Sequence, residues 1–362
     1  MEMWKTSAKK GRRGRRPLRI DGGKMVALND LTFEKMQEEF EGIGLRRYRA
    51  EQVFRWTANG AFSFDEMSNI SKELKQELEG KYILRSVKIE KRYQSEMDST
   101  RKFLMKMDDG ERVESVLMEY KHGYSVCVST QVGCLMGCKF CASTLNGKKR
   151  DLFASEILGQ ITEIQKSESI KISNIVLMGM GEPLDNYDNV IDFLRIVNHH
   201  LGLNIGIRHI SVSTCGLVDK IKKLADENLG IALSISLHAT TDEVRSKLMP
   251  INKKWCLDEL ISACREYCEK TRRRISFEYI LINELNDTYE DALRLAKMLE
   301  GITEHVNLIP VNDIGKGLLP SMKERRLQFR DWLMKMGVNT TIRRTLGSDI
   351  SASCGQLRAD NN

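Results

Sequence analysis

Two different spacings of apolar and polar positions divide the first third of the chain into two regions. Residues 30–82 place apolar side chains at helical spacing, and a Gly-Ile-Gly break at 42–44 interrupts them. Residues 87–130 instead alternate apolar and polar positions, which is typical of strands, with a turn at Asp108-Asp109-Gly110. We therefore expect a small helical module, a candidate contact for nucleic acid, followed by a β extension.

From residue 127 onward, short apolar strands recur with helical segments between them. Such alternation implies a parallel sheet, and the absence of a dinucleotide-binding glycine fingerprint favours a barrel over an open nucleotide-binding sheet. The predicted class is α/β, a partial (β/α)6 barrel of the TIM type in which the carboxyl ends of the strands carry the chemistry. The predicted strands are 125–130, 173–179, 209–214, 231–238, 274–282, 305–311 and 339–345, and the predicted helices are 154–167, 189–200, 257–271, 288–300 and 325–336.

The net charge of +7 is concentrated at one end of the chain. Residues 1–19 hold eight Lys or Arg and one Glu, so the remaining residues are formally neutral. A Gly-interrupted basic segment of this kind cannot bury a core, and we predict a disordered tail over residues 1–24. Binding to the phosphates of RNA would explain this concentration of positive charge, and a role as a solubilising extension explains it equally well.

Composition excludes several classes of protein. With 41% hydrophobic and 30% charged residues, the 362-residue chain has the values of a globular protein. No stretch approaches the ~18 consecutive apolar residues of a membrane helix, and no apolar run follows the basic N-terminus as in a secretory signal. Nine cysteines in such a chain indicate a reducing compartment, so we expect a cytoplasmic protein with no membrane partner.

The sharpest chemical signal is a cysteine cluster with C-x3-C-x2-C spacing. It consists of Cys134, Cys138 and Cys141, in the loop after the first predicted barrel strand. Three cysteines on a 4Fe–4S cluster would leave one iron open for a small chelating molecule, close to Phe140. A structural zinc site would need a fourth ligand, such as a distant His, and remains the alternative.

This spacing resembles that of the radical S-adenosylmethionine (SAM) superfamily. Further segments resemble one family within it, the RNA adenine C2-methyltransferases of the dual-specificity RlmN type, from about residue 30 to the end. They are CVSTQVGC at 127–134, MGMGEPLDNYDNV at 178–190, SVSTCG at 211–216, ISLHATTDEVRSKLMPIN at 235–252, FEYILINELND at 277–287, VNLIPVN at 306–312 and SDISASCGQL at 348–357.

The resemblance implies a cluster and two further thiols. One thiol carries the methyl group, and the other releases the product from it. Cys354 would accept a methyl group from SAM, Cys127 would attack the Cys354 sulfur to release the product, and Glu114 would accept the C2 proton. From the residues alone, Glu114 would be an outward-facing polar residue on an alternating strand. Cys134, Cys138 and Cys141 would hold a 4Fe–4S cluster, and the implied SAM contacts are Gly181, Glu182, Ser213, Ser236, Leu237, His238 and Asn312.

The implied partners are RNAs and a reductant. The expected substrate is an adenine of 23S rRNA, with the adenine next to the anticodon of tRNA as a second candidate, and flavodoxin or ferredoxin as the electron donor to a monomeric enzyme. The predicted divisions are a tail at 1–24, a helical accessory domain at 25–86, a β extension at 87–119, the barrel at 120–349 and a C-terminal loop with the methyl-accepting Cys at 350–362.

Three alternatives stay open at the level of sequence. A Cfr-type enzyme would methylate C8 of the same rRNA adenine with the same cysteines. An RNA-binding iron–sulfur protein could have lost catalysis, and a zinc-stabilised binding module could lack the cluster altogether. The remaining thiols receive no role, and Cys264 and Cys268 are expected to lie in the core of an amphipathic helix.

Overall fold

The computed structural model describes residues 20–21, 24–121, 123–312 and 314–359. Most of the predicted basic tail, 1–24, lies outside these ranges. Its described end is not irregular but forms a two-stranded antiparallel ribbon of β1 (Ile20–Asp21) and β2 (Lys24–Met25). Within the described ranges, no helix is both long and apolar enough to cross a bilayer.

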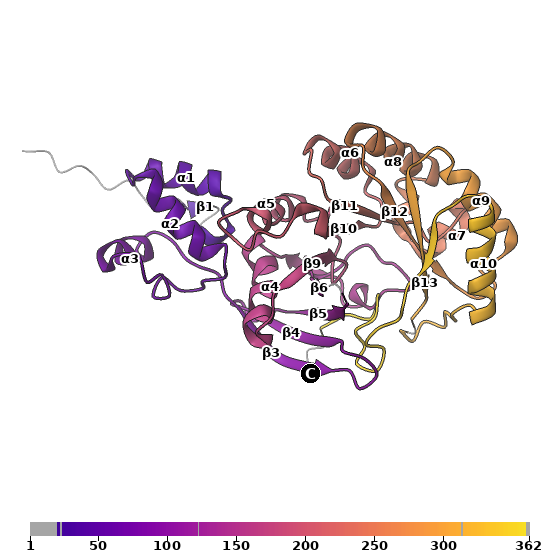
Figure 1. Ribbon diagram of the computed structural model, residues 1–362, viewed down its shortest axis with the longest axis horizontal. Coiled ribbons are helices and arrows are strands. Elements are labelled where there is room, and N and C mark those ends of the chain that lie inside the picture. Colours follow the sequence, from indigo (N-terminus) through magenta and orange to yellow (C-terminus); the bar gives the residue numbers. More distant parts are fainter. Residues whose placement is uncertain (1–19, 22–23, 122, 313, 360–362) are drawn as a thin grey trace, which may run out of the picture.

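Short helices form a group at one end of the molecule, as the spacing of 30–82 predicts (Figure 1). Thr32 and Ser71 begin two of them, and each side chain accepts a hydrogen bond from a main-chain N–H of the first turn. Helical spacing buries Met36 and Phe40 on one face of the first helix. The elements are η1 (Leu28–Asp30), α1 (Phe33–Gly42), α2 (Arg47–Thr57) and α3 (Lys72–Glu79).

One ten-stranded sheet organises the rest of the described chain. Its strand order is β14-β13-β12-β11-β10-β9-β6-β5-β4-β3. Seven consecutive strands, from β6 to β14, pair in parallel, and β3, β4 and β5 add an antiparallel edge. The bounds are β3 (Val87–Gln94), β4 (Arg101–Met107), β5 (Arg112–Tyr120), β6 (Gly123–Cys127), β9 (Ile172–Leu177), β10 (Ile210–Thr214), β11 (Ala232–Ser236), β12 (Ile275–Leu281), β13 (Glu304–Pro310) and β14 (Thr340–Ile342).

Helices connect each parallel strand to the next, so the predicted partial (β/α)6 barrel is confirmed (Figure 1). Because the strand order ends at β14 and β3, the sheet stays open. The helices are α4 (Ala154–Glu168), α5 (Tyr187–Asn198), α6 (Val218–Asp226), α7 (Asp242–Leu248), α8 (Leu257–Thr271), α9 (Tyr289–Leu299) and α10 (Lys323–Lys335), with short 3-10 turns η2 (Ala142–Thr144), η3 (Ile207–His209) and η4 (Pro250–Lys253).

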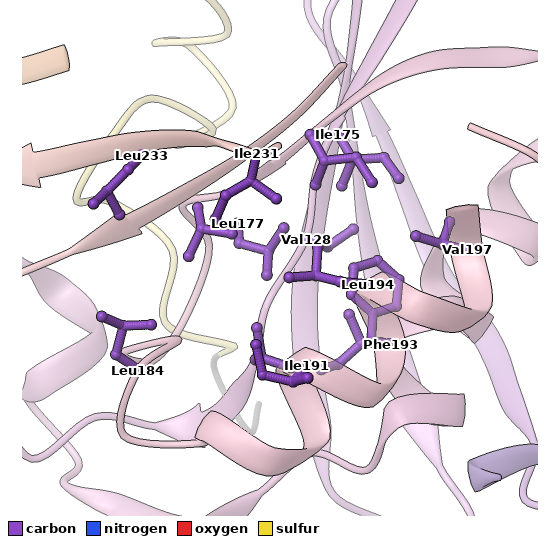
Figure 2. Close-up of a cluster of buried hydrophobic side chains, with 14 of the residues drawn as sticks. Val128, Ile175, Leu177, Leu184, Ile191, Phe193, Leu194, Val197, Ile231 and Leu233 are labelled. Carbon is purple, nitrogen blue, oxygen red and sulfur yellow. The ribbon is translucent and has the colours of Figure 1, made fainter. Parts of the chain in front are cut away.

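Apolar side chains fill the space between the sheet and the helices that cover it. Figure 2 shows Val128, Ile175 and Leu177 from the strand layer beside Ile191 and Leu194 of α5. All five are at most 5% exposed. Burying a side chain of this size stabilises a fold by about 1.5–3 kcal/mol, so this layer fixes α5 against the strands that lead to the site.

The predicted alternation fails on β5, where residues 113–118 are buried on both faces. On one side α4 covers the strand, and Ser115 Oγ donates to Gln160 Oε1 at 2.7 Å. On the other side the main-chain N–H of Arg358 donates to Glu114 Oε2 at 3.0 Å. A strand covered on both sides has no solvent face, which is why the period of two misleads here.

Some short elements are absent from the predicted set. The helix α7 has seven residues, too few for a clear apolar period. The helix α6 has nine residues and does bury Val218, Ile221 and Leu224 at helical spacing, so its pattern could have been recognised. Two further strands, β7 (Gln131–Gly133) and β8 (Lys148–Asp151), pair antiparallel outside the main sheet. They form the base of the predicted cysteine loop.

Candidate active site

The carboxyl ends of the parallel strands surround one cavity, as expected of a barrel of this kind. It brings together residues that are up to 220 positions apart in the sequence, from Cys134 to Cys354. Leu237 is the exception among the expected SAM contacts, because its side chain is fully buried in the core. The predicted residues that line the cavity are Cys134, Cys138, Cys141, Gly181, Glu182, Ser213, Ser236, His238, Asn312 and Cys354.

The cysteine loop is an excursion between β7 and β8. Its ends meet where the N–H of Cys134 donates to the carbonyl of Gly147 at 3.0 Å. Gly133 has φ +77°, and a Cβ there would lie 1.8 Å from the Gly147 carbonyl oxygen. Only glycine fits this close approach, so residue 133 sets the geometry from which the cysteines depart.

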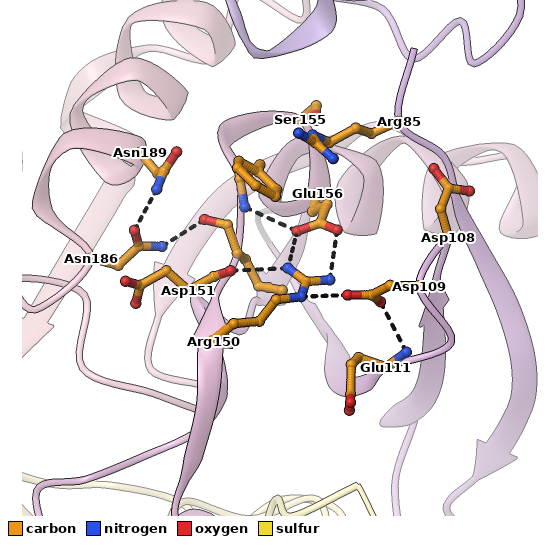
Figure 3. Close-up of polar contacts among 12 residues, drawn as sticks. Arg85, Asp108, Asp109, Glu111, Arg150, Asp151, Ser155, Glu156, Asn186 and Asn189 are labelled. Atoms are coloured by element: carbon orange, nitrogen blue, oxygen red, sulfur yellow. Dashed lines mark hydrogen bonds and ion pairs between the residues drawn. The ribbon is translucent and has the colours of Figure 1, made fainter. Parts of the chain in front are cut away.

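A polar network fastens the base of this loop to the rest of the barrel (Figure 3). Arg150 of β8 donates to both carboxylate oxygens of Glu156, at 2.7 and 2.9 Å, and to Asp109 at 2.6 Å. Glu156 lies in the first turn of α4, and Asp109 lies in the β4–β5 turn. Bidentate pairs of this type hold geometry well, so the ribbon is tied to two elements at once.

Burial makes the three loop thiols poor acids. It raises the pKa of Cys134 to about 12, and it also raises the pKa values of Cys138 and Cys141 above the ordinary range. The thiolates would also repel one another, since Cys141 raises the pKa of both others. Metal ligation needs thiolates, so a positively charged centre must supply the compensation.

The donor set fits a 4Fe–4S cluster better than a zinc ion. Among the described residues, no group of three or more Cys, His, Asp or Glu side chains is placed to hold a single metal ion. A zinc site needs four ligands around one point, whereas a cluster offers a separate iron to each thiolate. Cys134, Cys138 and Cys141 would hold three irons, and the fourth would face the cavity.

The turn after β9 places a buried carboxylate in the cavity wall. Glu182 is 4% exposed and accepts hydrogen bonds from the N–H groups of Cys215, at 2.7 Å, and Leu184, at 3.0 Å. Burial raises its pKa, and these hydrogen bonds oppose the rise. Gly181 has φ +101°, and a Cβ there would clash with the side chain of Gln131 at 2.5 Å. This pair can therefore present carbonyl and carboxylate oxygens to an ammonium group.

A neutral histidine lines the cavity at the end of β11. Burial, together with the charge of the nearby Arg245, lowers the pKa of His238 to about 3. The imidazole is therefore uncharged at neutral pH, and its Nδ1 accepts a hydrogen bond from the N–H of Ile280 at 3.1 Å. Its ring meets the ring of Phe140 edge to face, with centroids 4.8 Å apart. This contact connects the cysteine loop to the end of β11.

The C-terminal segment closes the cavity beside the cysteine loop. Asn312 Nδ2, after β13, donates to the carbonyl of Cys354 at 2.9 Å. The N–H of Ala142 donates to the carbonyl of Gly355 at 2.7 Å, and Ser143 Oγ donates to that of Leu357 at 2.6 Å. Cys354, itself half-buried, is thereby held in the same cavity as the three loop cysteines.

Cys127 ends β6 outside the cavity lining but within electrostatic range of Cys354. Burial raises the pKa of Cys127 to about 12; Cys354 adds to the rise, and Arg343 opposes it. Arg343 lines the cavity, and its own pKa is raised mainly by Cys354, with Glu278 and Cys127 acting in the same direction. The Arg343 guanidinium therefore interacts electrostatically with both thiols, and its Nη1 lies 3.7 Å from Glu278 Oε2.

Glu114 is not the outward-facing residue that the strand pattern predicts. It is 6% exposed, and Lys102 Nζ lies 2.9 Å from its Oε1. In the β5–β6 ladder Val116 lies opposite Cys127, so Glu114, two residues away, shares a face with Cys127. The correction follows from the C-terminal segment, whose Arg358 N–H covers this face.

Sequence reasoning gave no role to several residues of the cavity wall, among them Arg343, Glu278 and Met178. Glu278 lies within β12, Arg343 directly follows β14, and Met178 accepts a hydrogen bond from Arg343 Nη1 at 3.6 Å. A charged residue within or beside a buried strand is the signal that could have found the first two. Cys215, to which no role was given, also lines the cavity. Cys264 lies in the core of α8 as expected, whereas Cys268 is only half-buried.

Comparisons with known proteins agree with this fold and site. The radical SAM superfamily matches residues 128–296, and the ribosomal RNA large subunit methyltransferase N-terminal domain matches residues 26–84. A crystal structure of a radical SAM methyltransferase from Sphaerobacter thermophilus superposes with a TM-score of 0.86 and 40% identity, covering 92% of this chain and 100% of that one.

Curated relatives cover nearly the whole chain. A probable dual-specificity RNA methyltransferase RlmN from Clostridium novyi is 49% identical over 336 residues, which are 92% of this chain and 98% of the relative. A protein with the same name from Clostridium tetani is 50% identical over 335 residues, 92% and 96% of the two chains.

A partial α/β barrel with a C-x3-C-x2-C loop after its first strand defines a radical SAM enzyme. Its identity with full-length relatives narrows the class further. The chain belongs to the RlmN family of dual-specificity RNA methyltransferases. It is therefore a SAM-dependent methyltransferase of RNA whose cofactors are a 4Fe–4S cluster and SAM.

Proposed function

We propose that this enzyme methylates C2 of an adenine in the peptidyl transferase centre of 23S rRNA and C2 of the adenine next to the anticodon in tRNA. The observation that carries the proposal is the placement of Cys354 in one cavity with Cys134, Cys138 and Cys141. A thiol there can receive a methyl group and later present it to RNA. The dual-specificity name of the relatives supports two RNA substrates.

The cofactor site would be divided between the two halves of the cavity. Cys134, Cys138 and Cys141 would hold the cluster, which supplies the electron that cleaves SAM to a 5′-deoxyadenosyl radical. Glu182 and the carbonyl of Gly181 would bind the SAM amino group, because both present oxygen atoms at the wall. Ser213, Ser236, His238 and Asn312 line the remaining wall and would orient the rest of SAM.

Cys354 would act as the carrier of the methyl group. Its sulfur would attack the methyl group of one SAM molecule, forming a new S–CH3 bond as S-adenosylhomocysteine leaves and the thiol proton is lost. One hydrogen atom of that methyl would then pass to the 5′-deoxyadenosyl radical. The methylene radical left on Cys354 would add to C2 and join Cys354 to the RNA. Carbon 2 of adenine is electron-poor, so a carbon radical can add where a simple methyl transfer cannot.

Glu114 and Cys127 would then release the product. Glu114 would take the C2 proton, and the unpaired electron of the adduct, which entered at SAM cleavage, would return to the oxidised cluster that Cys134, Cys138 and Cys141 would hold. The Cys127 thiolate would then attack the Cys354 sulfur. An S–S bond forms as the S–CH2 bond breaks, and the methylene carbon keeps the electron pair and takes a proton to become the methyl group. The location of Glu114 and Cys127 on one face of the β5–β6 ladder supports this division of labour.

RNA binding has support in the helical module. Arg46 and Arg47 at the start of α2 are exposed, and the Arg49 guanidinium lies 4.8 Å over the Tyr48 ring. Cations interleaved with an aromatic ring suit phosphates and unstacked bases.

We propose a monomer that acts in the cytoplasm, with flavodoxin or ferredoxin as the electron donor.

The deciding experiment is an anaerobic reaction of the reconstituted enzyme with reductant, trideuteromethyl SAM and a 23S rRNA fragment, analysed by nucleoside mass spectrometry. We expect 2-methyladenosine lacking one deuterium, which would establish the C2 position and the methylene route together. An 8-methyladenosine product would assign the Cfr-type reaction instead, and a methyl group that keeps all its deuterium would exclude the radical route. A tRNA transcript in a parallel reaction tests the second substrate.

Single-cysteine variants separate the two thiol roles. Cys354→Ala should form no methylated RNA, because the carrier is gone. Cys127→Ala should instead accumulate a covalent protein–RNA adduct, seen as a gel-shifted band, because nothing attacks the Cys354 sulfur. Free release of methylated RNA by Cys127→Ala would remove Cys127 from the mechanism.

A further inference from the structure

Arg245 of α7 is fully buried, and no carboxylate of the described residues forms a direct ion pair with it. Its guanidinium donates only to neutral oxygens: the carbonyls of Cys215, Ser236 and Leu237, at 2.8, 3.1 and 3.1 Å, and the side-chain amide of Asn252, at 3.0 Å. Asp242 acts on it only at one remove, because its Oδ1 accepts a hydrogen bond from Asn252 Nδ2 at 2.8 Å. An arginine in this state is rare, because buried charges are normally paired.

The charge lies directly behind the wall of the candidate cluster site. Cys215 and Ser236, whose carbonyls Arg245 holds, both line the cavity. The segment that carries Arg245 also supports the cysteine loop, since the N–H of Lys139 donates to the carbonyl of Leu248 at 2.9 Å. Gly137 packs close to Pro250, where an added Cβ would be 3.3 Å from the ring.

A buried, unpaired guanidinium is costly unless a negative group lies near it. Four hydrogen bonds to neutral oxygens use four of its five N–H donors but leave its charge uncompensated. The cluster with three thiolates is net negative, and it becomes more negative when it accepts an electron. Charge near an iron–sulfur cluster is one of the factors that set its reduction potential.

We propose that Arg245 is the fixed counter-charge of the iron–sulfur cluster and a positioning residue that holds the ends of β10 and β11 at the SAM site. The proposal rests on the assignment of Cys134, Cys138 and Cys141 as cluster ligands. The positive charge favours the reduced cluster, and the four hydrogen bonds set the positions of the loops after two neighbouring strands. No contact between Arg245 and RNA is involved.

The test is a potentiometric titration of the reconstituted enzyme without RNA, followed by electron paramagnetic resonance of the reduced cluster. Arg245→Met removes the charge, and we expect its midpoint potential to shift to more negative values than in the wild type. Arg245→Lys restores the charge without the fork of donors, and we expect its midpoint to return toward the wild-type value while its Kd for SAM rises. A purely structural role would not produce this rescue.

A control is Arg195→Met. Arg195 of α5 is paired with Glu227 at 2.8 Å and neither lines the cavity nor supports the cysteine loop, so its loss should leave the midpoint unchanged. A wild-type midpoint in Arg245→Met, at full iron content, would overturn the proposal. If Arg245→Met does not fold, Arg245→Gln serves in its place, because it keeps hydrogen bonding without charge.

The test separates this proposal from the proposed reaction. A wild-type protein that binds no cluster would remove the ligand assignment and the counter-charge with it. A wild-type protein with a normal cluster signal but no methylated RNA would remove the proposed reaction and leave the Arg245 comparison intact. Iron and sulfide analysis of each preparation distinguishes the two cases.

Discussion

Cys127 presents a conflict between its environment and its proposed task. Attack on the Cys354 sulfur needs a thiolate, yet burial raises the pKa of Cys127 to about 12. Arg343 and a hydrogen bond with the main chain of Met178 oppose the rise, and the Arg343 guanidinium interacts with both thiols. In the proposed reaction, formation of the thiolate would therefore depend on Arg343.

The raised pKa of Cys127 has a measurable effect on stability. In the unfolded chain this thiol loses its proton near its ordinary pKa of 9.0, whereas the folded protein keeps the proton up to about pH 12. The contribution is complete below pH 9 and is lost as pH rises, with a slope of up to ~1.4 kcal/mol per pH unit for one group. In urea unfolding above pH 9, Cys127→Ala should lose stability less steeply than the wild type.

The control is Cys256→Ala, which removes a thiol at the start of α8, outside the cavity. Its unfolding free energy should follow the wild-type dependence on pH. A Cys127→Ala variant with the wild-type slope would show that the thiol is not protected from ionisation by the fold.

Site residues could be predicted from the sequence where they belong to a motif of fixed spacing. They could not be predicted where contacts between distant segments of the chain determine their environment. The C-x3-C-x2-C pattern indicates three ligands directly. The burial of Glu114 depends on Arg358, more than 200 positions later, and no local pattern contains that information. The interactions of Arg343 and Arg245 likewise involve groups on other elements, which the local sequence does not reveal.

At the scale of elements, the ribbon of β7 and β8 determines the geometry of the cysteine loop. Gly133→Ala would place a Cβ 1.8 Å from the Gly147 carbonyl at φ +77°. Backbone must shift to relieve this clash, so we expect the variant to retain less than half of the wild-type iron after reconstitution. The measurement is iron per chain, with the absorbance of the cluster as a second readout.

Gly147→Ala is the matched control within the same ribbon. Gly147 also has a positive φ, +67°, but an added Cβ meets nothing within 4 Å. Its cost is limited to backbone strain of about 1–2 kcal/mol, and iron content should stay near the wild-type level. Equal iron loss in both variants would show that strain, and not the close approach, is responsible.

Elements of the barrel could be predicted because their apolar runs are long and regularly spaced. The predicted helix at 257–271 agrees with α8 in its bounds, and the predicted strand at 209–214 agrees with β10 to within one residue. The ribbon could not be predicted in this way, since Gln131–Gly133 is three residues long. Its pairing depends on the Arg150 network and on a glycine contact, neither of which has a period.

At the scale of the whole molecule, the antiparallel extension and the C-terminal segment are fastened to each other. Asp349 accepts hydrogen bonds from Ser95 Oγ and from the N–H of Glu96, both at 2.8 Å. The N–H of Gly347 donates to Asp98 Oδ2 at 2.9 Å. The β3–β4 turn therefore positions the segment that carries Cys354.

Asp349→Ala should weaken this attachment without disturbing the cluster. The variant loses both hydrogen bonds that Asp349 accepts from the β3–β4 turn, so we expect the methylation rate to fall by roughly tenfold. Iron content should stay at the wild-type level, and Asp331→Ala, which removes an exposed carboxylate of α10, should keep the wild-type rate. A wild-type rate in Asp349→Ala would show that Cys354 is positioned by other contacts.

The hydrogen bonds from Ala142 and Ser143 to the segment after Cys354 also impose an order on biosynthesis. Ser143 and Leu357 are 214 positions apart. At ~5–20 residues per second, a ribosome needs roughly 10–40 s to pass from one to the other. During this interval the nascent cysteine loop is exposed on the side that the segment later closes. Iron and sulfide can therefore be delivered to the loop before Cys354 has been translated.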